Sequence, residues 1–229
     1  MSIRIAVGTV IGLMAVGVAT MEAADQQAGA PPPGITRTEL ENNATVLVAR
    51  LRMAPGARED VHTHPFSAVV VQIGAGDVEM RLGDARTTTR RAHGFVEFIP
   101  REAPHAAANV GQEPFEVVTI AMKPDRRPGG EAPASAAPPG ITRAALLENA
   151  ETRVTHVKFA PSAREPVHTH PFDLVVVQLT PGRVEVRVGK DVSTREYAAG
   201  EVIFLPRDVP HAVSNVDREP FELLSVGIK

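Results

Sequence analysis

Short stretches of alternating or β-branched apolar residues, separated by turn residues, dominate the second half of the chain. They cover residues 152–159, 174–179, 183–188, 202–205, 211–215 and 221–228. Turn-forming sequences such as "TPG" at 180–182 and "GKD" at 189–191 lie between them. This pattern predicts an all-β fold, with one helical turn near residues 143–149. The pattern fits a sandwich and a barrel equally well.

The chain is an internal duplication. Moving the sequence by 106 positions aligns "PPGITR" at residue 32 with "PPGITR" at residue 138, and the register continues without a gap to residue 229. About half of the paired positions are identical. We therefore expect one domain over residues 32–123 and a second over 138–229. Residues 124–137, rich in Pro, Ala and Gly, are expected to form a linker.

The first 24 residues have a different character. One basic residue, Arg4, precedes an apolar and small-residue run that is shorter than a membrane-spanning helix needs, and small residues follow it. This pattern predicts a cleaved signal peptide over residues 1–24 and a flexible stretch over 25–31. The alternative is an uncleaved N-terminal anchor. Both place the remainder of the chain outside the cytoplasm, in the periplasm or secreted.

Composition narrows the chemistry further. A hydrophobic content of 43%, a charged content of 22% and a net charge of −3 are ordinary for a globular protein and give no reason to expect nucleic acid as a partner. The chain has no cysteine, so any metal site must use nitrogen and oxygen ligands.

Six of the eight histidines occupy matching positions in the two repeats. "VHTHPF" occurs twice, and because side chains alternate along an extended strand, the two histidines of each copy share a face. A third histidine follows in "PREAPH" and "PRDVPH". Neutral imidazole is a strong ligand for first-row transition metals. The candidate ligands are His62, His64 and His105 in the first repeat and His168, His170 and His211 in the second.

These residues resemble the two motifs of the cupin family. The first motif, a glycine, five residues, His-x-His and a later glycine, is matched by Gly56, the two histidines and Gly76. The second motif, which ends in histidine, three residues and asparagine, is matched by Gly94, Pro100, His105 and Asn109. Both repeats carry both motifs, so the chain is similar to a bicupin. The resemblance implies two tandem β-barrels, packed face to face as an internal pseudo-dimer, each with a three-histidine site.

The departures from the family pattern bear on function. Val69 and Val175 occupy the position of the family's glutamate ligand, Ser162 replaces a motif glycine, and Glu102 and Asp208 replace another. Three interpretations stay open. Three histidines alone could hold a divalent ion, as in three-histidine cupin dioxygenases; Gln72 and Gln178 could add a weak ligand, or only a hydrogen bond; or the barrels could bind no metal.

Two sets of arginines are candidates for supporting roles. Arg101 and Arg207, in the turn of the second motif, could orient a substrate carboxylate or hold the turn. Arg58 with Glu59, and Arg164 with Glu165, could orient a histidine or form a solvated ion pair.

Three functions follow as hypotheses. The first is a metal-dependent oxygenase acting on a small organic anion, the second a non-catalytic protein that binds metal or a small ligand, and the third an interaction module without chemistry. The metal could be Fe, Zn, Mn, Ni or Cu, and both sites could be filled. Whether the chain is an enzyme is left open by the sequence, and no residue stands out as a general base.

Overall fold

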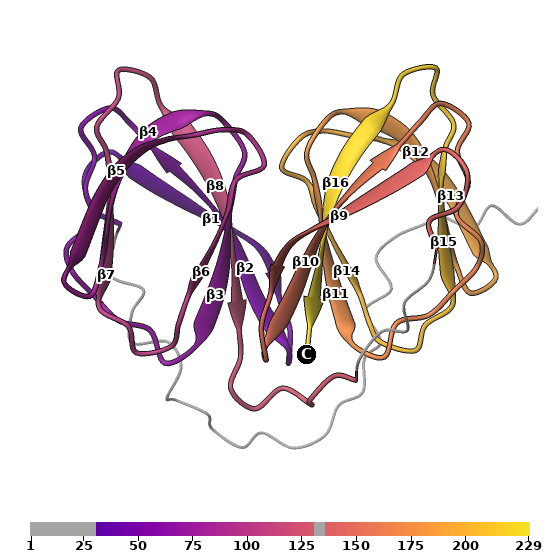
Figure 1. The fold of residues 1–229 in the computed structure, drawn as a ribbon, viewed down its shortest axis with the longest axis horizontal. Helices are drawn as coiled ribbons and strands as arrows, with labels where there is room; N and C mark the ends of the chain where they lie inside the picture. Colours follow the sequence, from indigo (N-terminus) through magenta and orange to yellow (C-terminus); the bar gives the residue numbers. More distant parts are fainter. Residues whose placement is uncertain (1–30, 131–135) are drawn as a thin grey trace, which may run out of the picture. The chain divides into compact units, whose positions relative to one another are not determined.

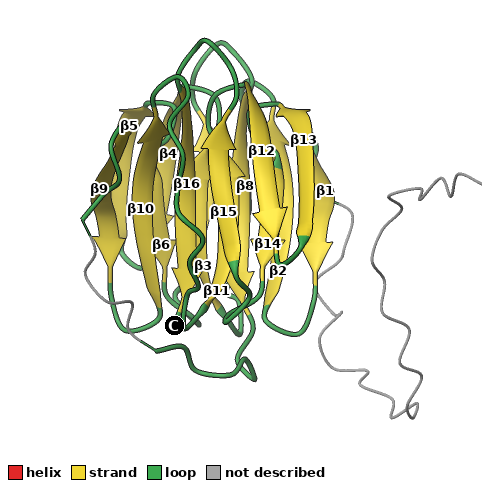
Figure 2. Ribbon diagram, turned by 90° about the vertical axis from the view of Figure 1, so that its right-hand side faces the viewer, coloured by secondary structure: helices red, strands yellow, loops and turns green. Residues whose placement is uncertain are grey.

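The computed structural model describes residues 31–130 and 136–229, which fold entirely into β-strands and loops (Figure 1, Figure 2). The predicted signal peptide and most of the flexible stretch at 25–31 lie outside these residues. No helix within the described ranges has the length and apolar character needed to span a membrane.

Every strand of the first repeat has a counterpart 106 residues later. The first repeat contains β1 (Ile35–Asn42), β2 (Val46–Met53), β3 (Ser67–Gln72), β4 (Gly76–Leu82), β5 (Ala85–Arg91), β6 (Val96–Ile99), β7 (His105–Asn109) and β8 (Phe115–Met122). The second contains β9 (Ile141–Glu148), β10 (Thr152–Phe159), β11 (Asp173–Gln178), β12 (Gly182–Val188), β13 (Asp191–Tyr197), β14 (Val202–Leu205), β15 (His211–Asn215) and β16 (Phe221–Ile228). We call these two units barrel 1 and barrel 2.

Each barrel consists of a five-stranded and a three-stranded antiparallel sheet. In barrel 1 the strand orders are β1-β2-β8-β3-β6 and β5-β4-β7, and barrel 2 repeats them as β9-β10-β16-β11-β14 and β13-β12-β15. The segment before β3 forms bridges to β7, at Arg58 with Ala108 and at His62 with His105, and then enters the larger sheet at Ser67. One chain segment thus joins the two sheets, which makes each unit a barrel and confirms the expected fold class.

Two apolar layers form in each barrel because strand residues alternate between faces. In the larger sheet of barrel 1, Val69 and Val71 of β3 join a core that also contains Val175 and Val177 of β11. Val70, between them, packs instead with Val78 and the rest of the barrel 1 interior. The larger sheets of the two barrels therefore share one buried core, as the family resemblance implied for an internal pseudo-dimer.

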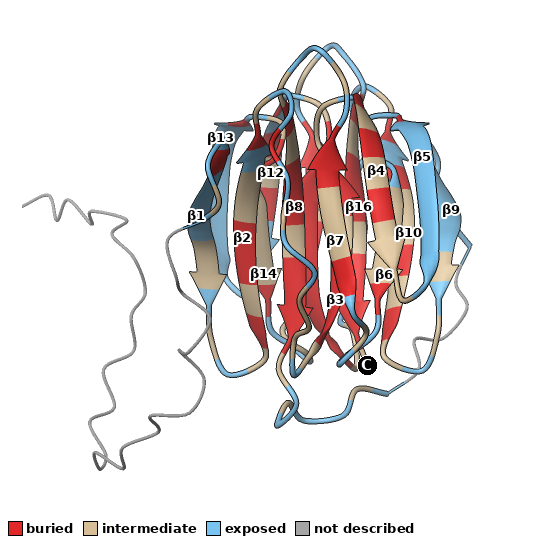
Figure 3. Ribbon diagram, turned by 90° about the vertical axis from the view of Figure 1, so that its left-hand side faces the viewer, coloured by how far each residue is buried: buried red, intermediate tan, exposed pale blue. Residues whose placement is uncertain are grey.

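The predicted helical turn at residues 143–149 was wrong, because this segment belongs to β9. We also missed β13, although its turn at residues 189–191 was expected. Both strands lie at a sheet edge and are exposed at nearly every position, as is β5 in barrel 1 (Figure 3). An edge strand whose side chains are mostly exposed needs no apolar alternation, so its sequence gives a weak strand signal.

Candidate metal centres

The three histidines of each barrel come together at the seam between the two sheets. His62 and His105 face each other across the bridge, where each backbone N–H donates to the other's carbonyl, at 3.0 and 2.9 Å. Residues directly opposite in an antiparallel pair present their side chains on the same face. His64 follows two residues after His62 and so joins the same face. His168, His170 and His211 repeat this arrangement in barrel 2.

The ring nitrogens converge at distances that suit a single ion. The Nε2 atoms of His62 and His64 are 3.1 Å apart, as are those of His168 and His170. Within each trio all candidate ligand atoms lie within 4.8 Å of one another. Two nitrogens held at about 2.1 Å from one ion are about 3.0 Å apart at an octahedral angle and about 3.4 Å apart at a tetrahedral angle. The 3.1 Å spacing of the His-x-His pairs lies within this range, and it is also the distance of a hydrogen bond between the two rings.

Backbone carbonyls fix which nitrogen of the ring is available. His62 Nδ1 lies 2.8 Å from the Asp60 carbonyl oxygen, and His105 Nδ1 lies 2.9 Å from that of Ala103. In barrel 2, His168 Nδ1 and His211 Nδ1 each lie 2.9 Å from such an oxygen. A carbonyl oxygen can only accept, so Nδ1 must carry the proton and Nε2 keeps its lone pair for a metal.

Burial keeps two of the histidines neutral. Desolvation lowers the pKa of His64 to about 4, and neighbouring His62 and His105 add to the effect. Desolvation likewise lowers the pKa of His170 to about 4, with smaller contributions from His168 and His211. A neutral imidazole is the form that binds a metal, so neither ring needs to lose a proton first at neutral pH.

The second-motif turn holds the His-x-His segment in place. Glu102 and Asp208, which replace the family's glycine, adopt the left-handed φ values of 57° and 61°. The Glu102 N–H donates to the His64 carbonyl at 2.8 Å, and the Asp208 N–H donates to that of His170 at 2.9 Å. The turn thus ties the second motif to the first.

The position of the missing glutamate needs a correction. Val69 and Val175, which we assigned to that position, point into the core between the barrels and away from the histidines. The side chains on the barrel interior are those one residue earlier, Ala68 and Leu174. Leu174 packs in the interior core of barrel 2, and Ala68 is buried. Because these side chains are also apolar, neither barrel has a carboxylate there.

Gln72 and Gln178 lie at the end of β3 and β11, eight residues beyond the second histidine. Their amide nitrogens donate to the carbonyls of Gly74 and Thr180, at 2.6 and 2.8 Å. This contact favours the hydrogen-bonding interpretation. The Gln72 amide oxygen is buried without a hydrogen-bond partner among the described residues, and its role as a ligand stays a prediction.

The two candidate substrate-orienting arginines differ. The Arg207 guanidinium donates to Asp173 Oδ2 at 3.2 Å and to the carbonyls of Arg127 and Pro128, each at 2.7 Å. It therefore holds the turn and the linker, which is the structural alternative. Arg101 is exposed, and its backbone N–H donates to Ser67 Oγ at 3.0 Å.

Sequence reasoning gave too little weight to Glu165. Its side chain is only 11% exposed, and Oε1 lies 3.8 Å from His168 Nε2 and 2.5 Å from an Arg143 nitrogen. The equivalent Glu59 accepts a hydrogen bond from the Ala107 N–H at 3.2 Å. Glu165 therefore lies beside the histidine site and is held there by Arg143, whereas Arg58 forms an exposed ion pair with Glu79. The repeated "ITR", which contains Arg37 and Arg143, was the signal that could have identified this pair.

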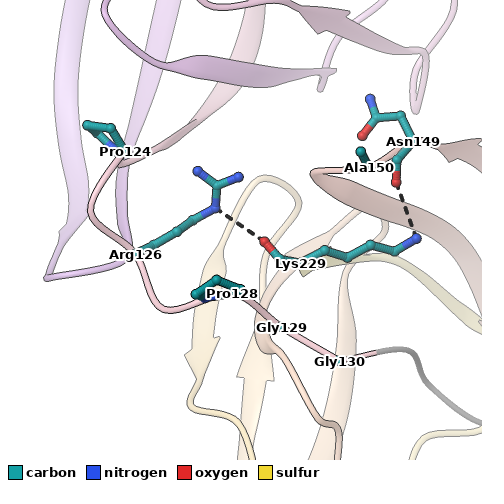
Figure 4. Close-up of a pocket in the computed structure, with 8 residues that line it drawn as sticks. All are labelled: Pro124, Arg126, Pro128, Gly129, Gly130, Asn149, Ala150 and Lys229. Carbon is teal, nitrogen blue, oxygen red and sulfur yellow. Dashed lines mark hydrogen bonds between the residues drawn. The ribbon is translucent and has the colours of Figure 1, made fainter.

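Another cleft lies beside the linker, near Pro128, Gly129 and the C-terminal Lys229 (Figure 4). Its two charged side chains already have partners, since Arg126 contacts Glu151 and Lys229 contacts Glu148. We assign it no ligand.

Comparison with known proteins agrees with this architecture. The cupin domain model (Cupin_2) matches residues 155–227. The beta-alanine degradation protein BauB of Pseudomonas aeruginosa is 32% identical over 83 residues, which cover 36% of this chain and 87% of that protein.

Solved structures share the two-barrel fold at low sequence identity. The oxalate decarboxylase of Lactobacillus farciminis, in a formate complex, has a TM-score of 0.70 at 14% identity and covers 94% of this chain and 88% of its own. AerE from Microcystis aeruginosa has a TM-score of 0.67 at 16% identity, with coverage of 84% and 97%. Salicylate 1,2-dioxygenase from Pseudaminobacter salicylatoxidans has a TM-score of 0.64 at 12% identity, with coverage of 80% and 71%. With both motifs, both barrels and these matches in agreement, the chain belongs to the cupin superfamily, as a tandem bicupin.

Proposed function

We propose that each barrel holds one divalent transition-metal ion through its three histidines and that the protein is an exported oxygenase acting on a small organic anion. The observation that carries the proposal is the state of the rings. In each trio two Nδ1 atoms are engaged by backbone carbonyls, which leaves the Nε2 lone pairs of these two rings available, and the candidate ligand atoms of all three residues lie within 4.8 Å of one another. A site that served only packing or solvation would not need this shared orientation.

The ligand set suits an anionic substrate. Three neutral histidines leave a divalent ion with its full charge, whereas a glutamate would cancel part of it. Ala68 and Leu174 supply no carboxylate, which disfavours the oxalate decarboxylase type of chemistry and favours a substrate that brings its own negative charge. A bound ion would supply Lewis acidity and, if redox-active, electron transfer to dioxygen.

Residues around the trio would position the ligand. Phe66 stacks on His64 with ring centroids 5.0 Å apart, and Phe172 stacks on His170 at 5.4 Å. Arg37 and Arg143 lie close enough to act electrostatically on His64 and His170. The rings would restrict rotation of the histidines, and the arginines would favour an anion on that side of the site.

A second candidate function is metal or ligand storage without turnover. One observation favours it: the carboxylate nearest to a trio, that of Glu165, is held by Arg143 and so is poorly placed to take a proton from a substrate. Loss of all binding chemistry, leaving an interaction module, is the remaining outcome.

Oxygen uptake by protein loaded anaerobically with ferrous ion separates these functions. We expect two ions per chain, and oxygen consumption with at least one member of a panel of β-diketones, thiols, phenolic acids such as salicylate, and small carboxylates including β-alanine. The name of the BauB relative is the reason for the last compound. Two bound ions without turnover on any compound would favour storage, and absence of binding would contradict the proposal.

Matched histidine variants identify the site. His64→Ala combined with His170→Ala should abolish both metal binding and turnover. The control is His93→Gln combined with His156→Gln, since these histidines belong to neither trio. The control should keep two ions per chain.

The exported location is part of the proposal and rests on the N-terminal pattern alone. Cell fractionation, with determination of the N-terminus of the mature protein, tests it. A protein that starts at Met1 and stays in the cytoplasm would contradict it.

A further inference from the structure

Four side chains at one end of the core between the barrels differ systematically between the repeats. Barrel 1 contributes Thr45 and Ser67, and barrel 2 contributes Glu151 and Asp173 at the two equivalent positions, 106 residues later. Both hydroxyls thus belong to one repeat and both carboxylates to the other.

These side chains pair across the two barrels. Thr45 Oγ1 donates to Asp173 Oδ2 at 2.9 Å, and Ser67 Oγ donates to Glu151 Oε1 at 2.8 Å. The two contacts join the same two positions of the repeat. In the first contact barrel 1 supplies the earlier position and barrel 2 the later one, and in the second contact the roles are exchanged. Each is a hydrogen bond to a charged acceptor, which is stronger than one between neutral groups.

Arginines neutralise the two carboxylates and leave room for one more donor. Arg126 of the linker contacts Glu151 at 3.0 Å, and Arg207 contacts Asp173 at 3.2 Å. Asp173 is 7% exposed, and the Arg207 backbone N–H also donates to it. The hydroxyl from barrel 1 therefore supplies a further donor to a largely buried acid.

At the opposite end of the shared core, equivalent residues of the two barrels also make different contacts. Arg50 of barrel 1 donates to the Gly200 carbonyl of barrel 2 at 2.7 Å. The equivalent residue in barrel 2 is His156, which contacts Glu222 of its own barrel at 2.8 Å. The cation that crosses between the barrels is supplied by barrel 1.

We infer that this interface selects an unlike repeat and rejects a like one, so that barrel 1 pairs with barrel 2 and two copies of barrel 2 cannot pair. In a pair of second repeats, Glu151 would face Asp173 twice, and each contact would place a partly exposed carboxylate against a buried one. Two like charges this close repel each other, and burial of one of them strengthens the repulsion. In a pair of first repeats, Thr45 would face Ser67 without any charged acceptor. The distribution of acids therefore favours pairing of barrel 1 with barrel 2 of the same chain.

The test is a charge-relocation series in the intact chain. Thr45→Glu with Ser67→Asp recreates, inside one molecule, the acid-on-acid contact of two second repeats. We expect the thermal unfolding midpoint to fall by about 5–10 °C. Adding Glu151→Thr and Asp173→Ser to this variant moves both acids to barrel 1, and should recover at least half of the loss.

An isosteric control separates charge from bulk. Thr45→Gln with Ser67→Asn has the same size as the acidic variant and no charge, and we expect less than half of its midpoint loss. An equal loss in the two variants would overturn the inference, as would a fourfold variant no more stable than the acidic double variant. If the acidic double variant does not fold, recovery of folded protein in the fourfold variant supports the inference and its failure overturns it.

Discussion

Each barrel has its own trio of histidines in the same arrangement, but the two barrels differ in the side chains that fill the interior. Barrel 1 contains an ion pair between Arg91 and Glu97, 2.9 Å apart, with the arginine side chain only 6% exposed. Barrel 2 has Tyr197 and Ile203 at these positions, packed into its apolar core. The histidine geometry is the same in both barrels, so it does not depend on what lies deeper in the barrel.

This difference distinguishes two regions of each barrel, the seam that carries the histidines and the interior. The seam between the sheets holds the candidate metal ligands through backbone contacts, which survive changes of side chain. The interior side chains are free to differ between the two barrels.

Removing one histidine should have the largest effect, and only in one barrel. His64→Ala removes a ligand of the first trio, and we expect at least a 100-fold loss of metal affinity there, with the second site unchanged. His170→Ala should do the reverse. Metal content after dialysis should be one ion per chain in each variant, and loss of both ions from a single substitution would show that the sites are coupled.

Breaking the ion pair of barrel 1 should destabilise the protein without emptying its site. Arg91→Met leaves Glu97 partly buried and unpaired, which should cost about 2–4 kcal/mol of unfolding free energy. Replacing both residues by those of barrel 2, as Arg91→Tyr with Glu97→Ile, should cost less than the single change. Urea unfolding measures the cost, and metal titration should give two ions per chain in both variants.

Acid should weaken both barrels over the same range of pH. The folded-state pKa of His64 and of His170 is about 4, below the ordinary value of 6.5, because burial disfavours the charged form. The unfolded chain therefore takes up protons first as the pH falls from 6.5, and the stability of the metal-free protein should decrease until about pH 4. Urea unfolding at pH 7, 5.5 and 4 measures the slope, which should be reduced in the variant His64→Gln with His170→Gln.

Substitutions at one left-handed backbone position should have the smallest effect on the free energy of unfolding. Gly56 of barrel 1 and Ser162 of barrel 2 are equivalent and both have left-handed φ values, 77° and 62°. A serine is strained in this conformation and a glycine is not. Ser162→Gly should raise the free energy of unfolding by about 0.5–1 kcal/mol and Gly56→Ser should lower it by about 1 kcal/mol. Equal signs for the two changes would contradict this explanation.

The sequence predicted those strands that bury at least one face. Strands such as β10, β14 and β16 have bounds that match their apolar stretches, because one or both faces are buried. The six candidate ligands were found because they survived in both copies, and the structure brings them together as two trios. The edge strands β9 and β13 were missed because their side chains face solvent on both sides.

Contacts made by long side chains could not be predicted from the sequence in the same way. The sequence does not show which way the Arg207 guanidinium points, and its contact with the Arg127 carbonyl depends on the path of the linker. The choice of Val69 for the motif position, rather than Ala68, has a simpler cause. One residue of uncertainty in motif spacing turns a strand side chain to the other face of the sheet.

The reciprocal backbone bond between His62 and His105 has a consequence for how an ion enters and leaves. The two histidines lie on the two chain segments that pair at this seam. An ion bound to both would hold these segments together, so the hydrogen bonds between them would open less often. The amide protons of His62 and His105, and those of His168 and His211, are therefore built-in reporters of occupancy. Their exchange with deuterium should slow in whichever barrel is loaded, which would allow the filling of each half of the molecule to be followed separately.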